Sequence, residues 1–222
     1  MAGGKDGGTI VWDLPTRLFH WALALCVIAA WFVGEFGLAS LSVHMMIGEV
    51  VLALLLFRVA WGFVGGRHAR FADFVRGPAA ILAYLRGGPP GTPGHNPLGA
   101  LSVLALIAVL LVQAGSGLFA DDDIATTGPL AGWVSSGARA TLTTVHKVAS
   151  KVVVTLVLLH VVAIAFYRFV KRQRLVEAMV TGRRTDVSPQ AGPGAAVEGG
   201  LARAAIVFAA CAAAVAILVR LG

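Results

Sequence analysis

The sequence contains few charged residues and almost no cysteine. Charged residues make up 13% of its 222 residues, about half of the roughly 25% found in soluble globular domains. Only two cysteines occur, and no CxxC or CxxCH pattern is present, which argues against c-type haem attachment, structural zinc and iron–sulfur clusters. We therefore expect no ordinary soluble domain, and we interpret Cys26 and Cys211 as small packing residues.

Two further features are missing. The N-terminus lacks the basic n-region, short apolar run and small-residue cleavage site of a secretory signal peptide, so we expect the first membrane helix to direct its own insertion. The basic residues give a formal net charge of +7, but they gather in loops and tails between apolar runs and form no single patch. This distribution favours a membrane protein over a nucleic-acid-binding protein.

Long apolar runs are abundant. Hydrophobic residues make up 58% of the chain, and the mean hydropathy is +0.83. A helix of about 20 mostly apolar residues crosses the hydrocarbon core of a bilayer. The sequence predicts such helices at about 17–36, 43–64, 97–120 and 141–169, with a fifth at 201–221. The expected fold class is therefore an all-α membrane protein, a four-helix transmembrane bundle with an additional C-terminal transmembrane helix.

The connections between these runs indicate the domain organisation and the orientation. Residues 65–97 form a long basic loop with an amphipathic stretch that we expect on the membrane surface. Residues 185–200 are rich in Gly, Ala and Pro and are predicted to be a flexible linker, which leaves residues 1–184 as the transmembrane domain. Basic residues are concentrated in the 65–97 loop and just after the fourth span. The positive-inside rule therefore predicts that the N-terminus and both basic segments are cytoplasmic.

Four histidines lie inside the predicted spans: His20, His44, His146 and His160. The last two are fourteen residues apart, which places them within ~40° of one helix face and ~21 Å apart along the axis. Because consecutive spans alternate in direction, His20 lies level with His160 near the cytoplasmic surface, and His44 lies level with His146 near the outer surface. Two imidazole pairs at two depths suit a bundle that holds two haems. Filling both axial positions of each iron is typical of electron transfer.

Each histidine also has an ordinary explanation, because a single histidine near the end of a membrane helix is more often an interfacial residue or a helix–helix hydrogen-bond partner. Four that match in depth favour haem ligation. Arg17 and Arg58 are candidate partners of the anionic haem propionates, and Lys147 and Lys151 flank His146 on the outer side. Snorkelling cations at helix ends explain Arg17 and Lys147 equally well.

Several other residues near the spans are open to two interpretations. Gly115 and Gly117 would let a porphyrin or a neighbouring backbone approach closely. Two acids in the outer half would accept protons from a quinol or serve as structural carboxylates: Glu35 and Glu49. His68 and His95 are interpreted as surface residues of the cytoplasmic loop, although His95 could approach a haem edge.

Several stretches together resemble one family. They are WDLPTRLFHW, FRVAWGFVGGRHARF, GHNPLGAL, and the fourth-span segments LTTVHK and LHVVAIAFYRFVK followed by AMVTGRR. Over residues 10–184 the chain is similar to the bacterial cytochrome b561 family, which includes the b-type cytochrome subunit of nickel–iron hydrogenases. The resemblance implies a four-helix cytochrome of the bacterial inner membrane with two non-covalent b haems. The ligand positions of the family match His20, His44, His146 and His160.

The resemblance also implies a function. Family members exchange electrons between a periplasmic donor and the quinone pool, and one branch oxidises superoxide with quinone as acceptor. We therefore expect a cytochrome that carries electrons between quinone and a periplasmic or membrane-associated redox protein. A free-standing superoxide:quinone oxidoreductase and a haem-free scaffold or transporter are the alternatives. The chain departs from the family in the HK pair that begins its fourth span, where many relatives have two adjacent histidines, and in the added 201–221 span.

Overall fold

The computed structural model describes residues 8–88, 91–92, 94–122, 124, 126–185 and 200–222. Within these residues, five helices are long and apolar enough to cross a membrane. They are α1 (Leu14–Phe36), α2 (Leu41–Val64), α5 (Pro97–Gly117), α6 (Ser136–Phe169) and α8 (Gly200–Arg220). The shorter elements are β1 (Thr9–Ile10), α3 (Phe71–Phe74), α4 (Pro78–Leu85), the 3-10 helix η1 (Ala131–Trp133), α7 (Leu175–Thr181) and β2 (Arg183–Arg184). The protein is an all-α membrane protein, as predicted.

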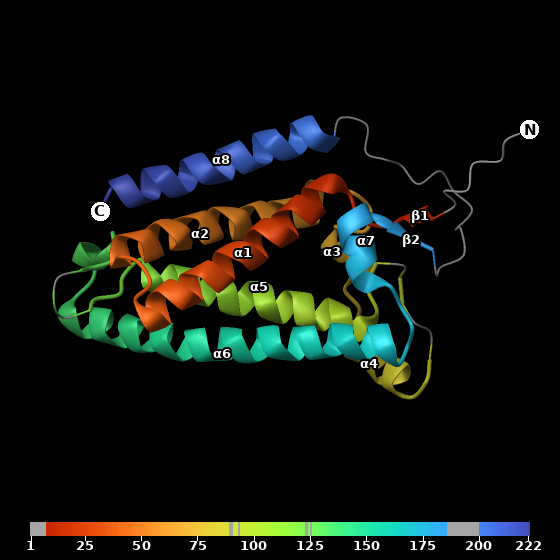
Figure 1. The fold of residues 1–222 in the computed structure, drawn as a ribbon. Coiled ribbons are helices and arrows are strands. Elements are labelled where there is room, and N and C mark those ends of the chain that lie inside the picture. Colours follow the sequence, from red (N-terminus) through yellow and green to blue (C-terminus); the bar gives the residue numbers. More distant parts are fainter. Residues whose placement is uncertain (1–7, 89–90, 93, 123, 125, 186–199) are drawn as a thin grey trace, which may run out of the picture.

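Helices α1, α2, α5 and α6 form the bundle, and α8 lies along the outside of α2 (Figure 1). Helix α2 is central, because it packs against α1, α5 and α8. Its most apolar stretch is 50% buried inside the protein, whereas the corresponding stretches of the other four helices are only 6% to 11% buried. The apolar faces that these four helices leave open are therefore available to lipid.

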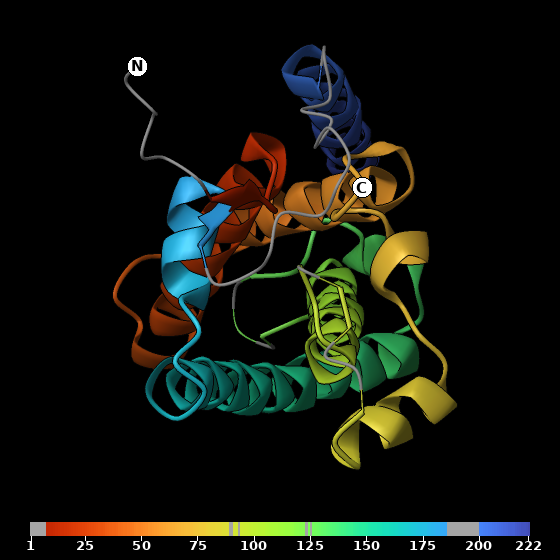
Figure 2. The ribbon, with the colours of Figure 1, turned by 90° about the vertical axis from the view of Figure 1, so that its right-hand side faces the viewer.

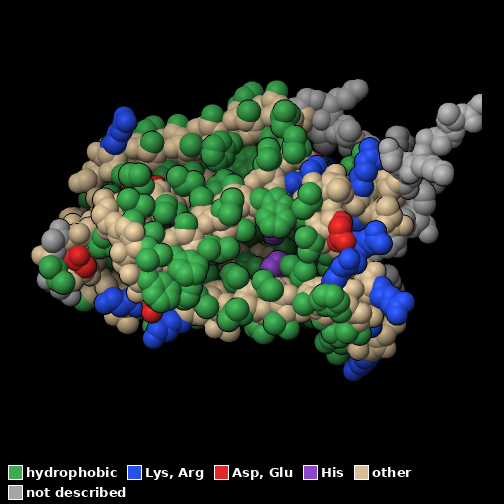
Figure 3. Space-filling view, viewed as in Figure 1, with side chains coloured by type: hydrophobic (Ala, Val, Ile, Leu, Met, Phe, Trp, Pro, Cys, Tyr) green, Lys and Arg blue, Asp and Glu red, His purple; other side chains and the backbone are tan. Residues whose placement is uncertain are grey.

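The surface fits a membrane environment. Hydrophobic side chains cover the long side of the molecule in Figure 3. Lysine and arginine side chains gather at the ends, most densely at the end where α7 and β2 lie. An apolar belt between charged ends is the pattern expected of a multi-pass membrane protein.

Polar caps explain where two of the spans begin. Asp13 caps α1 by accepting a hydrogen bond from the backbone N–H of Thr16 at 2.8 Å. Pro15 occupies the first turn, where a missing N–H is tolerated. Helix α6 likewise begins after its N-cap Ser135. Both helices therefore start a few residues before the apolar runs that begin near residues 17 and 141.

The segment after α6 folds back onto the start of the chain. Strand β2 pairs antiparallel with β1, and α7 packs against α6. Arg17 of α1 donates a hydrogen bond to the carbonyl oxygen of Val180 at the C-terminal end of α7. Trp21 donates to the carbonyl of Met179 at 3.4 Å. We call α7 and β2 the strap. Figure 2 shows α7 between α1 and α6 at the end of the bundle.

The basic loop between α2 and α5 contains two short helices, α3 and α4. Pro78 begins α4, at a position where proline is compatible with a helix. Helix α4 exposes leucine side chains, as expected of a helix on the membrane surface. Its Tyr84 hydroxyl lies 2.8 Å from that of Tyr167 on α6, which also accepts a hydrogen bond from the Asn96 amide at 2.8 Å. These bonds tie the surface helix to the bundle.

The C-terminal helix α8 covers part of α2. Phe208 contacts Phe57 of α2 edge-on, with ring centroids 5.9 Å apart, and Ala204 joins the buried cluster around Phe57 and Trp61. The linker predicted at residues 185–200 falls almost wholly on residues 186–199, which lie outside the described residues. Helix α8 contains no histidine, so it buries apolar surface and contributes no ligand of that type.

Candidate functional site

The first histidine pair lies toward the end of the bundle that carries the strap. His20 comes from α1 and His160 from α6, and their ring centroids are 6.5 Å apart. The Nδ1 atom of His20 is buried and has no hydrogen-bond partner among the described residues. Trp21 contacts the His20 ring edge-on at 5.0 Å. Figure 3 shows histidine atoms at the bottom of a hollow on the face viewed.

The second pair joins α2 and α6 at the opposite end. His44 and His146 have ring centroids 6.1 Å apart. The Nδ1 atom of His44 lies 2.9 Å from the carbonyl oxygen of Ala30, and that of His146 lies 2.9 Å from the carbonyl oxygen of Gln113. A ring whose Nδ1–H donates to a carbonyl keeps its Nε2 lone pair for another partner. In His146 that nitrogen lies 3.1 Å from the amide nitrogen of Gln113.

The spacing within each pair suits one shared metal ion. A metal–imidazole bond is about 2.0 Å long and the bonded nitrogen lies about 1.1 Å from its ring centroid, so two imidazoles on opposite sides of one ion have centroids about 6.2 Å apart. The observed distances of 6.5 Å and 6.1 Å lie close to this value. Among the described residues, no three His, Cys, Asp or Glu side chains gather into a cage for a bare metal ion. The arrangement therefore fits an ion whose other ligands come from a porphyrin.

A cavity opens beside the second pair. Its volume is ≈ 760 Å³, within the range of about 300–1,000 Å³ typical of cofactor pockets. His44 and His146 line it together with Gly34 and Gly117. A Cβ atom added at Gly34 would lie 3.0 Å from the His44 ring, and one at Gly117 would lie 2.9 Å from the His146 ring. Gly115, in contrast, has nothing within 4 Å of such an atom. Of the two glycines named in α5, only Gly117 therefore makes room for a histidine ring.

The charged residues predicted to lie in the same half of the bundle as His44 and His146 line the same cavity. They are Glu35, Glu49, Lys147 and Lys151. Within the part of the chain that the structure describes, none of the four forms an ion pair. Asp121 and Asp122 stand at the cavity as well, so acids outnumber lysines around it.

The two arginines predicted to hold propionates differ in their surroundings. Arg58 is only 3% exposed. Its guanidinium lies over the Phe71 ring at 5.0 Å, and its Nη1 atom has no hydrogen-bond partner among the described residues. Arg17 is already bonded to the strap through Nη2, while its buried Nε has no partner within the same residues. Both therefore retain a donor for an anion.

One of the two loop histidines is not the surface residue that the sequence suggests. The His95 ring lies against Trp12 and Phe74, with centroid distances of 4.8 Å and 4.4 Å. Burial, followed by the charges of Arg58 and His68, lowers the pKa of His95 to about 3. Burial also lowers the pKa of His68, which is partly buried. The turn before α5 thus carries a packed, neutral imidazole.

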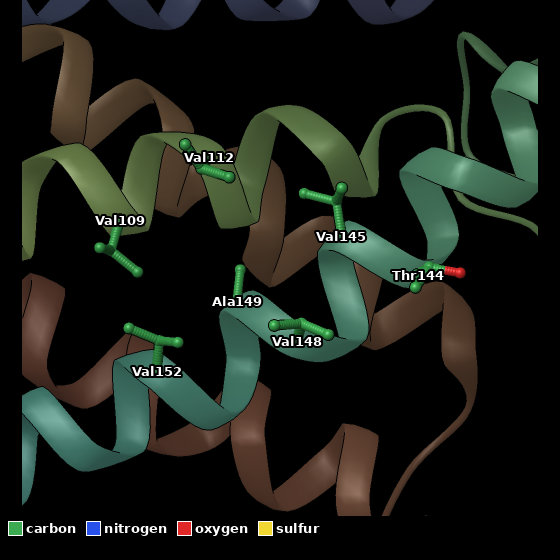
Figure 4. Close-up of a pocket in the computed structure, with 7 residues that line it drawn as sticks. All are labelled: Val109, Val112, Thr144, Val145, Val148, Ala149 and Val152. Carbon is green, nitrogen blue, oxygen red and sulfur yellow. The ribbon is translucent and has the colours of Figure 1, made fainter.

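A smaller cavity lies between α5 and α6. Its volume is ≈ 360 Å³, and Figure 4 shows that valine side chains surround it, with Ala149 and Thr144. None of its lining residues is charged or able to ligate a metal. We therefore place the chemistry at the histidine pairs and regard this smaller cavity as part of the apolar surface.

Sequence reasoning missed the residues that orient the histidine rings. The Ala30 carbonyl contacts His44, the Gln113 backbone and side chain contact His146, and Gly34 faces the His44 ring. Backbone carbonyls leave no signal in a sequence. A polar Gln113 and a glycine inside otherwise apolar spans are signals that could have been followed.

A bundle of membrane-spanning helices that brings histidines of separate helices together in two pairs is typical of integral membrane b-type cytochromes. Comparison with known proteins is consistent with this class. The family described as prokaryotic cytochrome b561 matches residues 11–182. The chain belongs to this family. It is therefore a multi-pass membrane protein and a haem protein of electron transport, and the predicted family is confirmed.

Three similar proteins carry the name probable Ni/Fe-hydrogenase B-type cytochrome subunit. The protein from Azotobacter chroococcum mcd 1 is 29% identical over 217 residues, which are 81% of this chain and 90% of the relative. The protein from Azotobacter vinelandii is 29% identical over 219 residues, with the same two shares. The protein from Rhodobacter capsulatus is 27% identical over 213 residues, which are 79% of this chain and 80% of the relative. No solved structure matches the chain.

Proposed function

We propose that this protein is a dihaem cytochrome that carries electrons between a partner redox protein and the quinone pool of a bacterial inner membrane. His20 and His160 ligate the haem nearer the cytoplasm, and His44 and His146 ligate the haem nearer the periplasm. When bound, each haem supplies a one-electron redox centre. The chain would hold each haem through two imidazoles from separate helices, which suits electron transfer.

One observation carries this proposal. The imidazole centroids lie 6.5 Å and 6.1 Å apart in two pairs, and both pairs include a histidine of α6. Fourteen residues along one helix separate the two levels by ~21 Å. This spacing supports a redox path across most of the hydrocarbon core, which is about 30 Å thick.

The partner is inferred from the relatives. Proteins similar over most of this chain are named as hydrogenase cytochrome subunits. We infer that the electron donor is a periplasmic or membrane-associated enzyme such as a hydrogenase, and that quinone is the exchangeable partner in the bilayer. In this role the chain carries electrons but does not generate them.

Arg17 and Arg58 are proposed partners of the propionates of the cytoplasmic-side haem. Each retains a buried nitrogen without an acceptor among the described residues. Arg58 follows His44 by fourteen residues on α2, and His160 follows His146 by fourteen on α6. Because His44 and His146 lie side by side, and because both helices run inward from the outer surface in the proposed orientation, Arg58 is expected level with His160.

Single substitutions test the pairing. His20→Ala and His160→Ala should each remove the same haem, leaving about half of the wild-type haem per chain, and His44→Ala and His146→Ala should each remove the other. Reduced-minus-oxidised spectra of the purified variants measure both haems. The matched control is His68→Ala, because His68 belongs to neither pair. Unchanged haem stoichiometry in all four variants would show that the pairing is wrong.

A free-standing superoxide:quinone oxidoreductase is the second candidate. Lys147 and Lys151 line the outer cavity and would attract an anion. The cavity is also lined by acids that would repel an anion: Glu35, Glu49, Asp121 and Asp122. Electron transfer between a partner redox protein and quinone therefore remains our proposal. Rapid haem reduction by superoxide in the purified protein would favour the enzyme. A haem-free scaffold is not proposed, because the family is one of cytochromes.

A further inference from the structure

Two buried side-chain nitrogens near the strap end of the bundle lack a hydrogen-bond partner among the described residues. The Nη1 atom of Arg58 and the Nδ1 atom of His95 are both buried without a hydrogen-bond partner among the described residues. Arg58 as a whole is 97% buried, being only 3% exposed. A buried donor that lacks an acceptor is unfavourable, and more so when it is charged. The pair therefore points to an acceptor that the described residues do not supply.

Aromatic side chains hold both donors in place. The Arg58 guanidinium lies 5.0 Å over the Phe71 ring. Phe71 contacts Phe74, whose ring centroid is 4.4 Å from that of His95. Trp12 meets the His95 ring edge-on at 4.8 Å. The imidazole is thus packed between Trp12 and Phe74, and its nitrogen atoms are the part left to make polar contacts.

The two donors suit one carboxylate. Arg58 is close enough to contribute to the lowered pKa of His95, after burial itself. The imidazole is therefore neutral at physiological pH and carries one N–H, whereas the guanidinium stays charged. A charged guanidinium and a neutral N–H donor, linked through the Phe71 and Phe74 rings, are both suitable donors to a carboxylate.

The acid in electrostatic range is already engaged. Asp13 acts on Arg58, but one of its oxygens accepts from the backbone of Thr16 and the other accepts from the indole of Trp61 at 3.1 Å. Asp13 therefore balances charge without satisfying the Nη1 atom. The missing acceptor has to come from outside the described chain.

We propose that His95 joins Arg58 in binding one propionate carboxylate of the haem held between His20 and His160. The inference rests on the haem ligation proposed above and on the level that Arg58 shares with His160. His95 is a positioning residue in this role, because its N–H would hold a propionate at the edge of the haem and would not contact the iron. A free small anion has the same chemistry, and the experiment separates the two sources.

Two substitutions of His95, one that removes its N–H and one that removes its ring, test this role in the purified holoprotein. His95→Phe keeps an aromatic ring between Trp12 and Phe74 but removes the N–H. His95→Gln removes the ring but keeps an N–H donor. We expect His95→Phe to shift a propionate bending mode in the resonance Raman spectrum. We also expect it to speed the transfer of one haem to apomyoglobin about tenfold or more, as the loss of a hydrogen bond to a charged group implies. His95→Gln should stay near wild type, and so should the matched loop control His68→Phe.

Other outcomes overturn the proposal. If His95→Gln is the more defective variant, the ring acts through packing alone. If neither variant changes the Raman mode or the transfer rate while acetate binding to the protein falls in His95→Phe, the site takes a free anion. A wild-type protein with no haem at His20 and His160 would end both proposals. Unchanged spectra and rates in a two-haem protein would end this one alone.

Discussion

Two glycines determine how close the His44 and His146 rings approach neighbouring helices. Gly34 on α1 faces His44, and Gly117 on α5 faces His146, and in both cases a methyl group would lie at or within 3.0 Å of the ring. A contact of that length forces the ring or the helix to move. The geometry of the His44–His146 pair, which we propose as haem ligands, therefore depends on two positions that cannot themselves ligate anything.

We predict that Gly117→Ala lowers the haem content of the outer site by displacing the His146 ring. Gly115→Ala is the matched control, two residues away on α5 and with nothing within 4 Å of the added atom. Alanine favours a helix over glycine by about 1 kcal/mol, so the control should keep its haem and its thermal stability. Haem per chain, measured by a pyridine haemochrome assay, checks both. Equal haem in the two variants would contradict the close contact as the cause.

The limits of sequence reasoning show clearly at single residues. The four span histidines could be predicted as two pairs because direction alternates along a membrane chain, and the structure brings both pairs together. The packing of His95 could not be predicted. Its contacts come from Trp12 and Phe74, and nothing local in the GHNPLG turn indicates that these distant aromatic residues surround it.

Among the elements, the strap depends on one backbone conformation. Gly182 ends α7 with φ +82, and its carbonyl accepts hydrogen bonds from the backbone of Val11 at 2.8 Å and Trp12 at 3.1 Å. A Cβ atom there would lie 2.8 Å from the Trp12 carbonyl oxygen. These contacts join the two ends of the 11–182 region that the family match covers.

We expect Gly182→Ala to loosen the strap. A left-handed conformation costs a non-glycine residue roughly 1–2 kcal/mol, and the steric contact adds to this. Trypsin should then cleave faster after Arg183 and Arg184, and limited proteolysis followed by mass spectrometry measures the rate. The control is Gly132→Ala, because Gly132 has open space around it and its φ is not positive. Trypsin should cleave this variant at the wild-type rate. If trypsin cleaves both variants at the same rate, Gly182 does not hold the strap in place.

The bonds between α4 and the bundle give a second prediction at this scale. Asn96 caps α5 by accepting from Gly99 N at 2.7 Å and donates to the Tyr167 hydroxyl. Asn96→Ala should therefore lower the free energy of unfolding by about 1–2 kcal/mol, the usual cost of losing an N-cap. Thermal unfolding in detergent checks this, with Thr155→Val as a control whose lost hydroxyl bonds only within α6. An unchanged unfolding temperature for Asn96→Ala would contradict the structural role of the bond network.

The long helices were predictable and the small elements were not. Apolar runs of about 20 residues predict spans from length and hydropathy alone. Pairing of β1 with β2 joins residues more than 170 positions apart, and neither two-residue strand has a pattern of its own. The division of the basic loop into α3 and α4 also depends on packing, since Phe74 is almost completely buried while α4 has no buried residue.

At the scale of the whole molecule, α8 is an addition to a complete histidine set. The four paired histidines lie on α1, α2 and α6, and α8 contributes apolar packing to α2. A chain ending at Thr185 should keep both haems per chain but unfold at a lower temperature, because the faces around Phe57 and Leu54 lose their cover. Haem assay and thermal unfolding of the truncated protein measure the two effects. Loss of either haem would show that α8 supports the site.

The proposed orientation predicts that the chain before α8 and the chain after α8 lie on opposite sides of the membrane. Alkaline phosphatase fused after Thr185 should be inactive, because that point lies in the cytoplasm, whereas the same enzyme fused after Gly222 should be active in the periplasm. The basic residues that gather at the strap end favour this direction (Figure 3). Activity at the first point and none at the second would reverse the orientation.

Purified wild-type protein shows most plainly whether each of the two imidazole pairs ligates one haem iron. Haem should be counted per purified chain, and its axial ligation read from low-temperature electron paramagnetic resonance. The expected result is two haems per chain, both low-spin with two imidazole ligands. A single haem per chain, or a high-spin iron with an open axial position in the intact protein, would contradict it.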